Sequence, residues 1–78
     1  MYAVALISYF DNELKMTTIE SDSVVDAMLG GTKKILGPGS DWVDCLKCKT
    51  EEDVKEVFFN MDMSIGIIKI EESNGKVR

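Results

Sequence analysis

Apolar residues follow one another almost without a break along residues 2–10, where only Ser8 is plainly polar. Tyr, Val, Ile and Phe favour strands, and the run is too short for a typical helix, so it predicts a first strand. Asp11 and Asn12 follow, and both residue types tolerate turn conformations. Apolar and polar positions then alternate over residues 13–19, which predicts a second strand paired with the first in a hairpin.

The position of the turn predicts how the two strands pair. A two-residue turn at positions 11–12 sets Tyr9 opposite Leu14 and Ile7 opposite Met16. Because side chains alternate along a strand, the hairpin has two distinct faces. One face carries Ala3, Ala5, Ile7, Tyr9, Leu14 and Met16. The other carries Tyr2, Val4, Leu6, Phe10, Lys15, Thr17 and Ile19. Alanines allow close helix packing, so we assign the first face to the helices and expect the second to be an interaction surface.

A helix is expected within residues 20–39, read "ESDSVVDAMLGGTKKILGPG". Either Ser21 or Asp22 accepts hydrogen bonds from the first-turn amides, and Gly37 takes the left-handed cap at the other end. The glycine pair at 30–31 weakens the helix by up to about 1 kcal/mol per residue. We expect these glycines to mark a close backbone approach to the sheet or to a partner.

The second half of the chain predicts strand, helix and strand. "SDWVDCLKCK" (40–49) is expected to be a short third strand anchored by Trp42. "TEEDVKEVFFNMD" (50–62) predicts a helix that begins with a capping box of Thr50 and Asp53. Its apolar stripe consists of Val54, Val57, Phe58 and Met61. "SIGIIKIEE" (64–72) predicts the last strand.

These elements predict one small α+β domain over residues 1–72, followed by a frayed tail at 73–78. The expected order is β-β-α-β-α-β. We expect a two-layer sandwich in which a four-stranded, largely antiparallel sheet carries two helices on one face.

Composition narrows the possible functions. The 78 residues suffice for one domain, and a hydrophobic content of 45% with a charged content of 29% indicates a folded protein. A net charge of −5 disfavours direct nucleic-acid binding. No apolar run approaches the roughly 18 residues of a membrane span, and the N-terminus lacks the basic flank of a signal peptide. We therefore expect a cytoplasmic protein that does not bind membranes.

Candidate chemistry is sparse. The chain has no histidine, and its serines have no base of the usual kind beside them in the sequence. Cys45 and Cys48 form a C-x-x-C pair, but zinc needs four ligands, and a catalytic thiol pair usually lies at a helix N-terminus rather than before it. Asp41 and Asp44 are interpreted as a solvated loop end. We expect structural cysteines, no metal, no cofactor and no enzyme.

The first and last strands are apolar on both faces, a pattern typical of sheets covered on both sides. Two helices on one face leave the other face uncovered, so a second copy of the chain or a different protein is expected to cover it. The alternative is one helix on each face, which leaves no excess apolar surface.

The segment "AVALISYFDNELKMTTIESDSVVDAM" (3–28) resembles the start of small phage-encoded proteins, among them host-takeover factors and anti-CRISPR-type inhibitors of defence complexes. The resemblance covers a pattern rather than a motif and assigns no functional residue. It implies a compact, acidic, non-enzymatic domain that binds and blocks a host protein. The acidic balance fits one version of this action, in which surface carboxylates occupy a basic nucleic-acid site on that protein, and it fits ordinary solubility equally.

Two functions from different classes are therefore expected. The first is a protein-binding inhibitor that also forms a homodimer and contacts its target through Tyr2, Val4, Leu6, Phe10, Lys15 and Ile19. The alternative is a small-ligand-binding or regulatory module that uses the sheet face or the "GPGSDW" loop.

Overall fold

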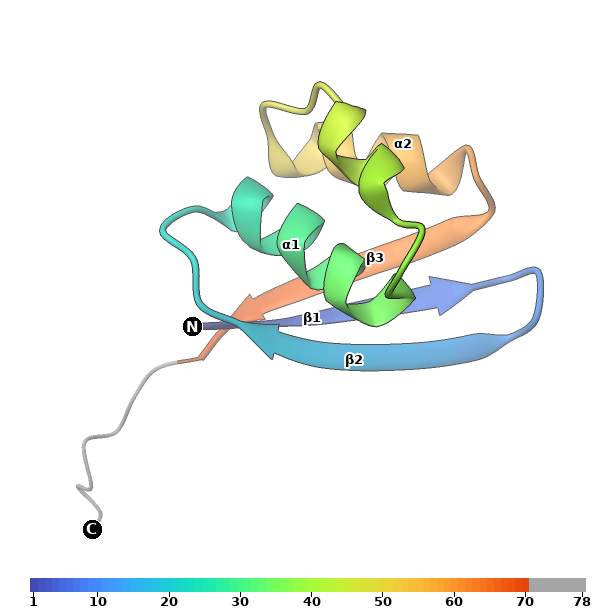
Figure 1. The fold of residues 1–78 in the computed structure, drawn as a ribbon, viewed down its shortest axis with the longest axis horizontal. Coiled ribbons are helices and arrows are strands. Elements are labelled where there is room, and N and C mark those ends of the chain that lie inside the picture. Colours follow the sequence, from blue (N-terminus) through green and yellow to red (C-terminus); the bar gives the residue numbers. More distant parts are fainter. Residues whose placement is uncertain (71–78) are drawn as a thin grey trace, which may run out of the picture.

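Three antiparallel strands form one sheet in the order β2-β1-β3, with β1 in the centre (Figure 1). The computed structural model describes residues 1–70. The strands are β1 (Tyr2–Ser8), β2 (Glu13–Ile19) and β3 (Met63–Lys69). The last two residues of the expected domain, and the expected tail at 73–78, lie outside the described residues. Within residues 1–70, no helix combines the length and apolar character needed to cross a bilayer.

The expected four-stranded sheet is wrong, because residues Asp41–Cys45 form a short 3-10 helix, η1, instead of a strand. Two observations explain this. The Val43 side chain is fully buried, and the Trp42 ring lies 6.3 Å from the Phe58 ring, centroid to centroid. The segment thus packs against the helices instead of adding to a sheet edge. The α+β class holds, with the order β-β-α-η-α-β.

The hairpin between β1 and β2 has a longer loop than the sequence predicted. Ser8 pairs with Glu13, so four residues (9–12) form the connection, and Asn12 adopts a φ of 56°. Ile7 consequently lies opposite Leu14 rather than opposite Met16. The register differs from the prediction by two residues. Because the side-chain period of a strand is also two, residues expected to share a face still share it.

The first helix, α1 (Val24–Leu36), lies across β1 and β2. Its N-cap is Ser23, whose hydroxyl accepts a hydrogen bond from the Asp26 amide at 3.0 Å, so the predicted cap at Ser21 or Asp22 is wrong by one or two residues. Its predicted end is confirmed, since Gly37 has a φ of 78° and its amide donates to the Lys33 carbonyl. The glycine pair does mark a close approach to the sheet. A Cβ atom on Gly31 would lie 2.7 Å from a Val4 methyl carbon.

The second helix, α2 (Glu51–Phe59), lies over β3 on the same face of the sheet as α1 (Figure 1). Its predicted capping box is confirmed: the Thr50 hydroxyl accepts from the Asp53 amide, and the Asp53 carboxylate accepts from the Thr50 amide. Val54 and Phe58 are fully buried, while Phe59 is exposed.

The core lies between the sheet and the helices and includes Val4, Leu6, Met28, Val54, Phe58 and Ile65. This reverses the predicted orientation of β1, in which the alanine face was to meet the helices. The close approach comes from the glycines of α1, not from alanines of the strand. Tyr2, Val4 and Leu6 of β1 therefore point toward the helices, and Ala3, Ala5 and Ile7 point away.

Candidate functional site

Within residues 1–70, no segment covers the sheet face opposite the helices, and this face carries no charged side chain. Paired residues of antiparallel strands project to the same face, and Val4 and Leu6 project into the core, so the alternate positions of each strand project outward. We call this set the open face. It consists of Ala3, Ala5 and Ile7 of β1, Leu14, Met16 and Thr18 of β2, and Ser64, Gly66 and Ile68 of β3. Three of its four large apolar members are well exposed: Leu14 is 60%, Met16 65% and Ile68 66% accessible, whereas Ile7 is half-buried.

The open face is hollowed along its centre. A shallow hollow of about 200 Å³ is lined by Ala3, Ala5, Met16, Gly66, Ile67 and Ile68, and its lining is almost wholly apolar. The hollow forms because Ala3 and Ala5 carry only a methyl group and Gly66 carries no side chain. A Cβ atom on Gly66 would meet nothing within 4 Å. Met16, from the neighbouring strand, stands beside this hollow.

One end of the open face is bounded by Tyr9. The Tyr9 hydroxyl lies 2.7 Å from the Ser64 hydroxyl oxygen, so Tyr9 is held against the end of β3. Phe10, the next residue in the loop, is 93% accessible. Tyrosine is enriched in interaction surfaces, so Tyr9 adds to that character at this end of the open face.

The residues predicted to form the interaction surface do not form one. Tyr2, Val4 and Leu6 are buried, and Ile19 packs against the core. Lys15 projects from β2 toward the helix layer and lies 3.4 Å from the Glu13 carboxylate. Of that set only Phe10 and Lys15 are exposed; Phe10 lies in the hairpin loop, and Lys15 lies on the helix side of β2. The alternation pattern separated the two faces correctly, but the face that it assigned to the helices is the exposed one.

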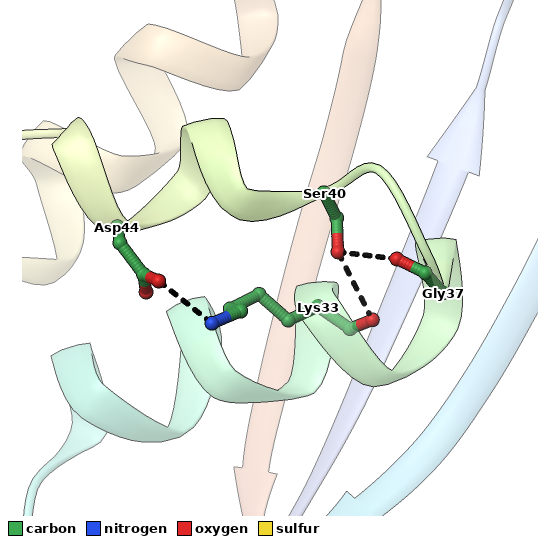
Figure 2. Close-up of polar contacts among 4 residues, drawn as sticks. All are labelled: Lys33, Gly37, Ser40 and Asp44. Atoms are coloured by element: carbon green, nitrogen blue, oxygen red, sulfur yellow. Dashed lines mark hydrogen bonds and ion pairs between the residues drawn. The ribbon is translucent and has the colours of Figure 1, made fainter.

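The "GPGSDW" loop, the alternative ligand site, is tied down by its own hydrogen bonds (Figure 2). The Ser40 hydroxyl donates to the Gly37 carbonyl at 2.5 Å and lies 3.5 Å from the Lys33 carbonyl. The Lys33 ammonium donates to Asp44 at 2.7 Å, and this bond raises the pKa of Lys33. The polar groups of Ser40 and Lys33 thus fix η1 to the end of α1.

The two cysteines are in different environments. Cys45 is exposed at the end of η1, whereas Cys48 is partly buried and packs against the core. Burial, with a smaller contribution from the nearby Asp53 carboxylate, raises the pKa of the Cys48 thiol. A raised pKa favours the neutral thiol, which is the less nucleophilic form. Among residues 1–70, no three Cys, Asp or Glu side chains gather as a metal site. The structural role of the cysteines stays a prediction.

Two further concave regions lie on the helix side of the sheet. An open groove of about 470 Å³ runs between α2 and β3 and is lined by Glu52, Lys55, Glu56, Phe59, Met63, Ser64 and Ile65. A smaller hollow of about 130 Å³ lies between the end of α1 and the hairpin. Phe59, 68% accessible, is the large apolar residue of the first groove, and charged side chains surround it.

Comparisons with protein-family models, with curated proteins and with solved structures found no match to the chain. The resemblance to phage-encoded inhibitors therefore stays a prediction from the sequence pattern.

Proposed function

We propose that this chain is a non-enzymatic protein-binding module that acts through the open face. The observation that carries the proposal is the absence of charge from a solvent-exposed sheet face that bears Leu14, Met16 and Ile68. A sheet covered on one side normally places polar residues on its other side. An exposed apolar patch surrounded by polar residues is typical of protein interaction sites.

The shape of the open face favours a macromolecule over a small ligand. Ligand pockets usually enclose 70–90% of the bound molecule, whereas the hollow over Ala5 and Gly66 is shallow and open along the sheet. The other proposed ligand site, the loop at Ser40, uses its hydroxyl within the fold. Neither site presents converging polar groups that would orient a metabolite.

The acidic side chains lie apart from the open face. Glu51, Glu52 and Asp53 occupy the first turn of α2, where they interact favourably with the helix dipole, and Asp41 and Asp44 belong to η1. Among residues 1–70, the excess of acidic over basic side chains therefore lies in the helix layer and the loops. Blocking of a basic site on a host protein in a host cytoplasm, as the phage resemblance implies, would use this second surface.

The test is native mass spectrometry of the tagged chain after recovery from cells that produce it. A protein partner adds kilodaltons to the mass, and a small ligand adds hundreds of daltons. We expect a kilodalton-scale addition that disappears in Met16→Glu, which places a charge on the open face, and persists in Phe59→Glu. The two variants are matched, because each exchanges an apolar side chain of about two-thirds exposure for the same carboxylate. Loss in Phe59→Glu alone would assign binding to the α2–β3 groove and contradict the proposal.

A further inference from the structure

We infer that the open face is occupied by a second copy of this chain, packed sheet against sheet in a symmetric dimer. This inference rests on the proposed function and names the partner. The dimer has four layers, helices outside and the two sheets in the middle, with the sheets about 10 Å apart as in other face-to-face packings.

Charge is the first argument. The open face carries no ionisable side chain, although the whole chain has 14 acidic and 9 basic residues. A charged partner surface would lose its hydration there and gain no opposite charge, which is costly. The occupant must therefore present an uncharged apolar surface of similar extent. The same open face on another copy is such a surface.

Shape is the second argument. In a two-fold symmetric interface, a protrusion on one copy must meet a depression on the other, and both must lie on the same surface. The open face has both: the exposed Met16 side chain on β2, and the hollow over Ala5 and Gly66 in the adjacent strands. Methionine is flexible and fills irregular gaps well. Each Met16 then enters the hollow of the other copy and displaces water from it.

Area sets the strength of the dimer. Three strands of seven residues give a face about 14 Å wide and 23 Å long, from spacings of about 4.8 Å between strands and about 3.3 Å per residue. The projected area is about 320 Å², which side-chain relief increases. Stable complexes bury about 800 Å² per partner, so this interface is smaller than theirs and belongs with the weak, transient ones. The dimer is accordingly reversible, and we place its dissociation constant between about 1 µM and about 1 mM.

Other occupants fit less well. Residues 71–78 of the same chain read "EESNGKVR", with Val77 the one apolar side chain, and so offer little to bury on this face. Pairing of two copies through the edge of β2 is opposed by Lys34, whose ammonium donates to the Thr18 carbonyl at 2.8 Å. Lysine at a strand edge is a common obstacle to strand addition.

Sedimentation velocity of the purified chain tests the inference, over concentrations from about 1 µM to about 1 mM, which bracket the expected dissociation constant. We expect the parent to pass from monomer to dimer within this range. Met16→Glu should remain monomeric throughout, with an unchanged circular dichroism spectrum, because position 16 is exposed in the monomer. Phe59→Glu should dimerise as the parent does.

A second variant distinguishes specific packing from general stickiness. Gly66→Val adds apolar surface to the open face, and its side chain enters empty space in the monomer. It also fills the hollow that receives Met16 of the other copy. We expect at least tenfold weaker dimerisation. Stronger dimerisation would show that the apolar surface associates without the proposed fit and would overturn the inference.

Failure of the inference is distinguishable from failure of the proposed function. A parent that stays monomeric at the highest concentration overturns the dimer. If Met16→Glu nevertheless removes a different protein from the cell-derived complex, the open face still binds protein and the proposed function holds. If no variant changes the native mass and the parent is monomeric, both are wrong.

Discussion

Gly31 is the residue on which the packing of α1 against the sheet depends. A Cβ atom there would lie 2.7 and 2.8 Å from two carbons of Val4, which is fully buried and β-branched, so its side chain has no room to rotate away. At Gly30 the nearest atom is the Cδ1 carbon of Ile19, at 2.6 Å. That atom is the end of a flexible, partly buried side chain. Two adjacent glycines thus face neighbours that differ in how far they can move.

The first prediction compares alanine at these two positions. Gly31→Ala should lower the free energy of unfolding by about 1–3 kcal/mol, because overpacking outweighs the gain in helix propensity. Gly30→Ala should leave it unchanged or raise it by up to about 1 kcal/mol, since Ile19 can rotate away. Urea denaturation measures both. Equal effects at the two positions would contradict the proposed contact between Gly31 and Val4.

Phe58 and Phe59 are neighbours with opposite environments, and this gives the second prediction. Phe58 is fully buried and its ring lies 6.3 Å from that of Trp42, whereas Phe59 is 68% accessible. Phe58→Ala should cost about 3–5 kcal/mol, a large part of the stability of a small domain. Phe59→Ala should change the free energy of unfolding by less than about 0.5 kcal/mol. Thermal melts of both variants check this, and similar melting temperatures would show that Phe58 is not a core residue.

At the scale of elements, periodicity predicted the hairpin, both helices and the last strand, because each has a regular apolar pattern. It failed at η1, where Trp42, Val43 and the following residues read equally well as a short strand. The decisive contact, Trp42 with Phe58, joins segments that only the tertiary fold brings together. In short apolar segments, the local sequence pattern discriminates poorly between strand and helix.

The open face shows a second limit of sequence reasoning. The alternation along β1 correctly separated Val4 and Leu6 from Ala3 and Ala5, and it predicted an uncovered face. Which of the two sets of β1 residues faces the helices depends on whether the strand or the helix supplies the small residues at their contact. In this fold the glycines of α1 supply it, so the larger strand residues fill the core. The alanines of β1, which also allow close helix packing, had suggested the opposite orientation.

The start of α2 carries the third prediction. The amides of Lys49 and Thr50 donate to the Asp53 carboxylate, and these bonds lower its pKa below the ordinary value of 3.8. The folded state therefore favours the ionised form. Its stabilising effect is complete above about pH 4 and is lost as the pH falls through the lowered pKa.

We expect Asp53→Asn to lose less stability than the parent between about pH 5 and about pH 2, because the variant lacks the titrating group. Glu52→Gln, in the same turn but outside the capping box, is the control and should follow the parent. Urea midpoints at several pH values give the comparison. A parent-like acid dependence in Asp53→Asn would show that other carboxylates dominate.

At the scale of the whole molecule, the fold separates two surfaces of different character. The helix layer and loops carry the excess of acidic side chains, and the opposite sheet face carries no charge. A face-to-face dimer keeps the two charged layers apart, on the outside, but both copies still carry a net charge of −5. The apolar contact must therefore overcome a repulsion that depends on ionic strength.

The last prediction follows from this repulsion. Raising the ionic strength from about 0.01 M to about 0.3 M shortens the screening length from about 30 Å to below 8 Å, so the dimer should become several-fold tighter. A complex held by acidic residues on a basic partner would respond in the opposite way and weaken with salt. Sedimentation of the parent at the two salt concentrations measures the sign, and Met16→Glu should stay monomeric in both. Weaker dimerisation at high salt would mean that opposite charges hold the two copies together, through the helix layer instead of the open face.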